Sequence, residues 1–125
     1  MKISLKIFFL LAITFFAGCF YDSEERLYPS ISGPCDDTVV TFSGTVTTIL
    51  QVCLTCHSNS AASSSGNGIK LQDYNDIMII VNNGRLIGAV NHLNGFVPMP
   101  DGGGKLPDCE IAQLQKWIDN GSLNN

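Results

Sequence analysis

Five consecutive residues, Cys53-Leu54-Thr55-Cys56-His57, carry the clearest chemistry in the sequence. Two thiols three positions apart, followed at once by an imidazole, form the pattern in which two sulfurs bond a haem and the histidine binds its iron. On a helical turn residues i and i+3 project to the same side, so both thiols can reach one flat ring. The pattern predicts covalent haem attachment at Cys53 and Cys56, with His57 as an axial iron ligand.

Two other chemistries use paired cysteines. A thioredoxin-like redox pair needs a βαβ context, and the sequence shows no alternation of strand and helix patterns. A zinc site would need two further ligands, for which Cys35, Cys109 and His92 are available. No second ligand pair has the compact spacing usual in such sites, so haem attachment is the preferred interpretation.

A second stretch, Val97-Pro98-Met99-Pro100, could supply the other axial ligand. Each proline restricts its own φ and the residue before it, so Met99 is expected in an extended backbone. The glycines at 102–104 would let the chain turn or approach a flat ligand closely. We therefore expect Met99 to bind iron opposite His57, whereas Met78, in an apolar run, is expected to pack in the core.

His92 is the alternative to Met99 as the second iron ligand. Bis-histidine ligation would lower the reduction potential, since axial ligands tune haem over about 0.8 V. The other role for His92 is a structural hydrogen bond near the Met99 loop. Arg85 could pair with a haem propionate through its planar fork, or could be a solvated surface residue.

The N-terminal residues 1–18 have the features of an export signal. Lys2 and Lys6 give it a positive start, and residues 7–17 form an apolar run. That run is too short to span a bilayer, which needs about 20 apolar residues. The sequence therefore predicts an exported protein.

The signal ends in Phe16-Ala17-Gly18-Cys19, which resembles the lipobox of bacterial lipoproteins, with Phe16 where leucine is more usual. The resemblance implies a lipid on Cys19, anchoring the protein to a bacterial membrane and facing the periplasm or the cell surface. An ordinary secretory signal with Cys19 incidental is the alternative. Residues 19–34 are polar, contain proline and lack a period, so we expect a flexible tether.

The net charge limits the kinds of partner, and the number of cysteines limits the possible disulfides. Without residues 1–18, five basic residues oppose eleven acidic ones, and the formal charge moves from −4 to −6. Such a surface has no basic stripe for nucleic acid. With Cys19, Cys53 and Cys56 assigned, Cys35 and Cys109 remain, and in an oxidising compartment such a pair is most simply a disulfide. Two separately buried thiols stay possible, because the sequence cannot show that the two meet.

The apolar spacing predicts three main helices. One runs from about 43 to 54 with Ser43 as N-cap, because apolar residues recur at helical intervals into Cys53. A second, capped by Asp73, runs through Asn83 and is stopped by Gly84, and a third runs from 107 to 120. The third should bury one apolar face, with Trp117 on the rim of that face and packing into the core. The small polar residues 58–68 predict an exposed loop that buries little.

Together these features resemble a single-haem cytochrome c domain over residues 35–125, in particular the small bacterial lipoprotein cytochromes. The resemblance implies an all-α fold in which N- and C-terminal helices cross and loops wrap one covalent haem c. It further implies an electron carrier, not an enzyme, with unidentified redox partner proteins and no small-molecule substrate. The alternatives are a haem subunit of a larger membrane redox complex, or a gas-binding sensor or enzyme if Met99 does not bind iron.

Overall fold

The computed structural model describes residues 35–125, and this part of the chain is helical without any strand. The all-α prediction is thus confirmed for these residues. The helices are η1 (Phe42–Val46), α3 (Thr47–Leu50), η2 (Gln51–Cys53), α4 (Leu54–His57), α5 (Tyr74–Asn82), α6 (Arg85–Val90) and α7 (Asp108–Asp119). None of these described helices is long and apolar enough to cross a membrane. The predicted signal 1–18, the lipidation site Cys19 and the tether 19–34 lie outside the described residues.

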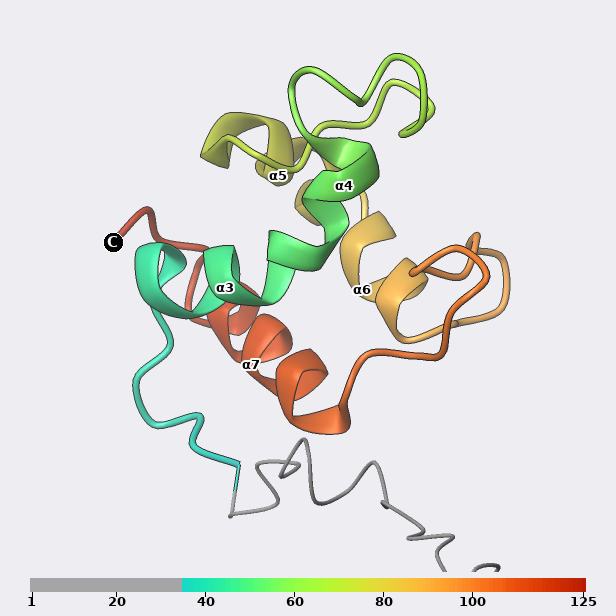
Figure 1. The fold of residues 1–125 in the computed structure, drawn as a ribbon. Coiled ribbons are helices and arrows are strands. Elements are labelled where there is room, and N and C mark those ends of the chain that lie inside the picture. Colours follow the sequence, from blue (N-terminus) through green and yellow to red (C-terminus); the bar gives the residue numbers. More distant parts are fainter. Residues whose placement is uncertain (1–34) are drawn as a thin grey trace, which may run out of the picture. The chain divides into compact units, whose positions relative to one another are not determined.

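The helix predicted from about 43 to 54 is a nearly continuous helical stretch from η1 to α4 that changes pitch along its length, as Figure 1 shows. Its N-cap is Thr41 and not Ser43. Thr41 has the extended backbone of a capping residue, and its Oγ1 accepts a hydrogen bond from the Gly44 N–H at 3.2 Å. The stretch ends at His57, so both cysteines and the histidine lie in its last turns.

The second predicted helix is α5, which begins directly after Asp73 and ends before Gly84, a glycine in the left-handed conformation. Ile77 and Ile80 are its buried residues, as the spacing predicts. The Asp73 side chain does not cap the helix, because it instead accepts a hydrogen bond from Asn59 Nδ2 at 2.8 Å. That contact ties the loop after His57 to the start of α5.

The third predicted helix is α7, and its buried face differs from the prediction by one position. Ile111, Leu114 and Trp117 are buried, whereas Ile118 is only partly buried. The Trp117 indole, expected on the rim of this face and packing into the core, is 1% exposed and lies in the core. A tryptophan covers more apolar area than an isoleucine, so burying it gains more.

An aromatic cluster joins the first helical stretch to α5 and α7. The Phe42 ring meets Tyr74 edge-on with centroids 5.1 Å apart and lies 5.8 Å from Trp117. These are favourable separations for aromatic pairs. η1 and α7 therefore pack together at one end of the described fold.

A disulfide joins Cys35 to Cys109, with Cα atoms 5.4 Å apart. It links the segment before the first helical stretch to the first turn of α7. The side chain of Gln113 adds a second link, because its Nε2 donates to the Asp36 carbonyl at 2.7 Å. The start of the described chain is thus held against α7.

Candidate functional site

A cavity of about 450 Å³ opens between α4, α6 and the loop that carries Met99. Its volume falls within the range of roughly 300 to 1,000 Å³ usual for small-molecule and cofactor sites. The apolar side chains on its wall are Val52, Ile69, Leu71, Ile80, Leu86, Ala89, Val90, Phe96, Val97 and Pro100. An apolar interior of this kind suits the faces of a flat aromatic ligand.

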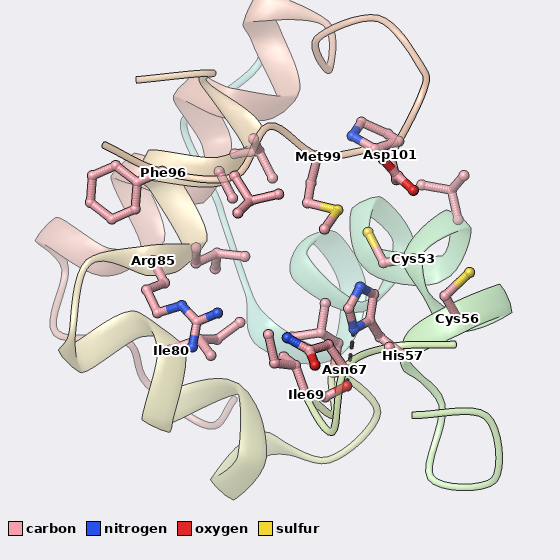
Figure 2. A pocket seen from close by; sticks show the side chains of 18 of the residues that line it. Cys53, Cys56, His57, Asn67, Ile69, Ile80, Arg85, Phe96, Met99 and Asp101 are labelled. Atoms are coloured by element: carbon pink, nitrogen blue, oxygen red, sulfur yellow. Dashed lines mark hydrogen bonds between the residues drawn. The ribbon is translucent and has the colours of Figure 1, made fainter. Parts of the chain in front are cut away.

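The same cavity gathers the residues that the sequence singled out. Cys53, Cys56, His57 and Met99 all line it, although Met99 comes from a distant part of the chain. Figure 2 shows the Met99 side chain pointing into the cavity from its loop and the His57 ring pointing into it from α4. The helix end and the loop thus present two thiols, an imidazole and a thioether to one space.

His57 is buried and has the hydrogen bonding of a metal ligand. Its Nδ1 lies 2.9 Å from the Ile69 carbonyl oxygen. A carbonyl can only accept, so Nδ1 carries the hydrogen and Nε2 keeps its lone pair in the neutral ring. Metal-binding histidines typically donate their other N–H to a protein acceptor, which fixes the tautomer and the ring orientation. The Leu71 N–H also donates to the His57 carbonyl at 2.8 Å, so the ligand's backbone is fixed too.

The loop at 58–68 is largely exposed, as the sequence predicts, but Ala62 and Gly66 are buried, and Gly66 lies against His57. A Cβ at Gly66 would lie 2.5 Å from the Cys56 carbonyl oxygen and 2.9 Å from His57 Nδ1. The small residues that suggested an exposed loop are therefore what lets the backbone pack closely against the histidine.

Cys53 and Cys56 are free thiols, the first partly buried and the second exposed. Burial, with a further contribution from the Glu110 carboxylate, raises the pKa of the Cys53 thiol. A catalytic redox pair needs a lowered thiol pKa, and residues 35–125 offer no strand for a βαβ unit. Both observations disfavour the thioredoxin-like alternative.

The zinc alternative lacks its other ligands. Cys35 and Cys109 are bonded to each other. Within the described part of the chain no three histidine, cysteine, aspartate or glutamate side chains come together as a metal site would require. A structural zinc ion takes four such ligands, so Cys53 and Cys56 have no partners for one here.

His92 is not part of the cavity wall. Its Nε2 is 3.0 Å from the Met99 carbonyl oxygen and must be the donor of that hydrogen bond. The structure therefore brings Met99, and not its alternative His92, to the cavity that holds the CxxCH residues.

Four polar residues of the wall were not assigned to the site from the sequence. They are Ser65, Asn67, Arg85 and Asp101, and Figure 2 shows the Arg85 guanidinium directed toward the cavity from α6. A guanidinium can pair with a carboxylate through two parallel hydrogen bonds. No sequence signal separates Arg85 from a solvated arginine, since its place depends on how α6 packs.

These residues fit a haem. Imidazole and thioether are the ligands that hold haem iron in electron-transfer proteins, and two neighbouring thiols can bond the porphyrin edge. The apolar walls suit the ring faces, and Arg85 offers a cation for its carboxylates. Comparison of the chain with protein-family models, with curated proteins and with solved structures found no match. What the site does must therefore be inferred from its own side chains.

Proposed function

We propose that this protein is a c-type electron carrier with one covalent haem. In this proposal Cys53 and Cys56 would bond the porphyrin, and His57 and Met99 would be the iron ligands. The observation that carries it is the gathering of two thiols, an imidazole with a free Nε2 and a thioether on one apolar cavity. The proposal includes a cytochrome c-like arrangement, in which the first helical stretch and α7 cross and loops enclose the haem.

The haem, when bound, supplies the reversible one-electron chemistry of its iron, while the chain supplies ligation and surroundings. His57 is held in one tautomer by Ile69, so its Nε2 lone pair would be available to the iron. Met99 would contribute a soft sulfur, which favours ferrous iron and raises the potential. If both side chains bind the iron, no coordination site is left for a substrate, as a carrier requires.

The location and partners belong to the same proposal. The features of residues 1–18 and Cys19 support export and a lipid anchor on a bacterial membrane, facing the periplasm or the cell surface. The partners would be redox proteins that exchange electrons with the haem. A permanent place in a larger membrane redox complex would appear as co-purification after gentle detergent extraction.

The test is the absorption spectrum of protein matured with a cytochrome c assembly system. We expect one covalently bound haem in a denatured pyridine sample and, in the ferric protein, the weak long-wavelength band of methionine-bound iron. The Met99→Ala variant should keep the haem and lose that band. It should also bind carbon monoxide in the ferrous state at least about tenfold more tightly, since the iron position is then open.

Met78→Ala is the matched control for this experiment. Met78 lies on α5, packs partly buried against the core and does not line the cavity. Its variant should keep the band and the weak carbon monoxide binding. Absence of covalent haem would overturn the proposal, and rapid carbon monoxide binding to the unaltered protein would favour a gas-binding sensor or enzyme instead.

A further inference from the structure

The backbone N–H and C=O of Met99 are both hydrogen-bonded, one to α6 and the other to His92 just after it. The Met99 N–H donates to the Ala89 carbonyl at 3.0 Å. The Met99 carbonyl accepts from His92 Nε2, also at 3.0 Å. A loop residue with both backbone groups bonded to a neighbouring helix end has little freedom to shift. One of these two bonds comes from the backbone and the other from a single side chain.

His92 has an unusual backbone conformation, which places its side chain within hydrogen-bond distance of Met99. It lies two residues after the end of α6, has a φ of +54°, and its N–H donates to the Ala89 carbonyl at 3.2 Å. A positive φ is unfavourable for a residue with a Cβ and persists only where the surroundings enforce it. Here it turns the chain sharply after α6, and the imidazole of His92 meets the returning loop at Met99.

The rest of this loop has few other attachments. Residues 93–98 are all exposed. Apart from the bonds at Met99, the loop is tied by the Leu93 N–H, which donates to the Gly88 carbonyl at 2.9 Å, and by the Phe96 ring packed against Gly88. A Cβ at Gly88 would lie 2.4 Å from that ring, so the contact is close. Neither attachment acts on Met99 itself.

We propose that His92 is a positioning residue that holds Met99 in the cavity, so that this hydrogen bond sets how readily the methionine leaves the iron. The inference rests on the proposed function. It gives His92 a role toward the iron without ligation, acting through the carbonyl of the residue that binds it. Loss of the donor should raise the population of the methionine-off state without changing the haem attachment at Cys53 and Cys56.

The experiment titrates imidazole into the ferric holoprotein and follows the methionine charge-transfer band. An added ligand binds only when Met99 is off the iron, so its apparent affinity reports the open population. His92→Ala should bind imidazole about 3- to 10-fold more tightly, the range expected for loss of one neutral hydrogen bond. His92→Gln, which keeps an N–H donor, should lie closer to the unaltered protein.

The matched control is Tyr74→Phe. The Tyr74 hydroxyl donates to the Ser122 carbonyl at 2.7 Å, also a bond from a side chain to a backbone oxygen, and Tyr74 does not line the cavity. This variant should leave imidazole affinity unchanged even if it lowers stability. His92→Gly serves as a second variant, because it removes the donor while relieving the positive φ, and it should match His92→Ala.

Two results would overturn the inference. One leaves the proposed function intact and the other does not. If the unaltered holoprotein shows the band but His92→Ala and His92→Gly bind imidazole as it does, His92 has no positioning role and the proposed function stands. If the unaltered holoprotein lacks the methionine band, Met99 is not the ligand, and the proposed ligation and the inference fail together.

Discussion

His57 shows how closely the site depends on single residues. One ring nitrogen is fixed by the Ile69 carbonyl, and the segment that carries Gly66 lies directly against the same nitrogen. Rotation of the ring or a change of tautomer would therefore break the hydrogen bond to Ile69. Gly66 also lines the cavity, so a side chain at position 66 would press on the histidine from within the cavity wall.

The Gly66→Ala variant tests this contact. Its Cβ would meet the Cys56 carbonyl at 2.5 Å and His57 Nδ1 at 2.9 Å, so the loop or the imidazole must shift. We expect a loss of about 1 to 3 kcal/mol in the free energy of unfolding, the usual cost of overpacking. A displaced ring should also alter the visible spectrum of the holoprotein. Chemical unfolding and absorption measure the two effects.

Gly104→Ala is the control for that variant. Nothing lies within 4 Å of a Cβ built at Gly104, and its φ is not positive. Its unfolding and its spectrum should match those of the unaltered protein. Equal stability and equal spectra for Gly66→Ala would show that the loop does not press on His57.

At the residue scale the sequence predicts which side chains could bind a cofactor better than it predicts which residues surround them. Cys53, Cys56 and His57 are neighbours, so their common location follows from one helical turn. That Met99 faces the same cavity depends on long-range packing, and only its setting between prolines suggested it. The role of Gly66 could not be read, because composition shows small residues but not what they approach.

At the scale of elements, the apolar spacing predicts where the helices lie, but it does not predict their caps or the limits of their buried faces. The helices α5 and α7 lie where the pattern predicts them. The N-cap at Thr41 and the partial exposure of Ile118 differ from prediction, because they depend on which residues the neighbouring elements cover. Helix limits reflect local hydrogen bonds, whereas burial reflects the whole fold.

The first turn of α7 is held to the segment before η1 by the Cys35–Cys109 disulfide. Replacing both cysteines by serine should lower the free energy of unfolding by about 2 to 5 kcal/mol, because the unfolded chain gains freedom. Urea unfolding of the holoprotein measures this change. The visible spectrum should stay the same, since the haem thiols are separate residues.

A noncovalent link between the same two segments provides the comparison. Gln113→Ala removes the hydrogen bond from Gln113 Nε2 to the Asp36 carbonyl and leaves the disulfide in place. Its effect should be no more than about 1.5 kcal/mol, the net worth of one hydrogen bond. Equal urea midpoints for the serine variant and the unaltered protein would mean that the disulfide does not constrain the unfolded chain.

At the scale of the whole described fold, its last residues complete its first helix. The Asn125 carbonyl accepts from the Ser43 N–H at 2.8 Å, and the Asn125 Oδ1 accepts from the Phe42 N–H at 2.9 Å. Figure 1 shows the C-terminus beside the start of that helix. The first N–H groups of a helix have no partner within it, so the tail supplies acceptors that the helix lacks.

Deletion of residues 123–125 should therefore destabilise the fold while leaving the cavity intact. It removes both acceptors at Asn125 and the Leu123 carbonyl, to which the buried Trp117 indole donates at 2.9 Å. An unpaired buried donor costs about 1 to 3 kcal/mol. The N–H groups at the helix start can turn to water, so we expect a total loss of about 2 to 4 kcal/mol.

Urea unfolding of the shortened holoprotein measures that loss, and Leu123→Ala separates backbone from side chain. The Leu123 side chain is 58% exposed, so its removal should change stability little while the carbonyl still accepts from Trp117. The methionine band should persist in both variants, because the tail does not line the cavity. If the shortened protein unfolds at the same urea concentration as the unshortened one, residues 123–125 do not stabilise the aromatic core, and the prediction is wrong. A loss of the band on shortening would instead mean that the aromatic core and the Met99 loop form one cooperative unit.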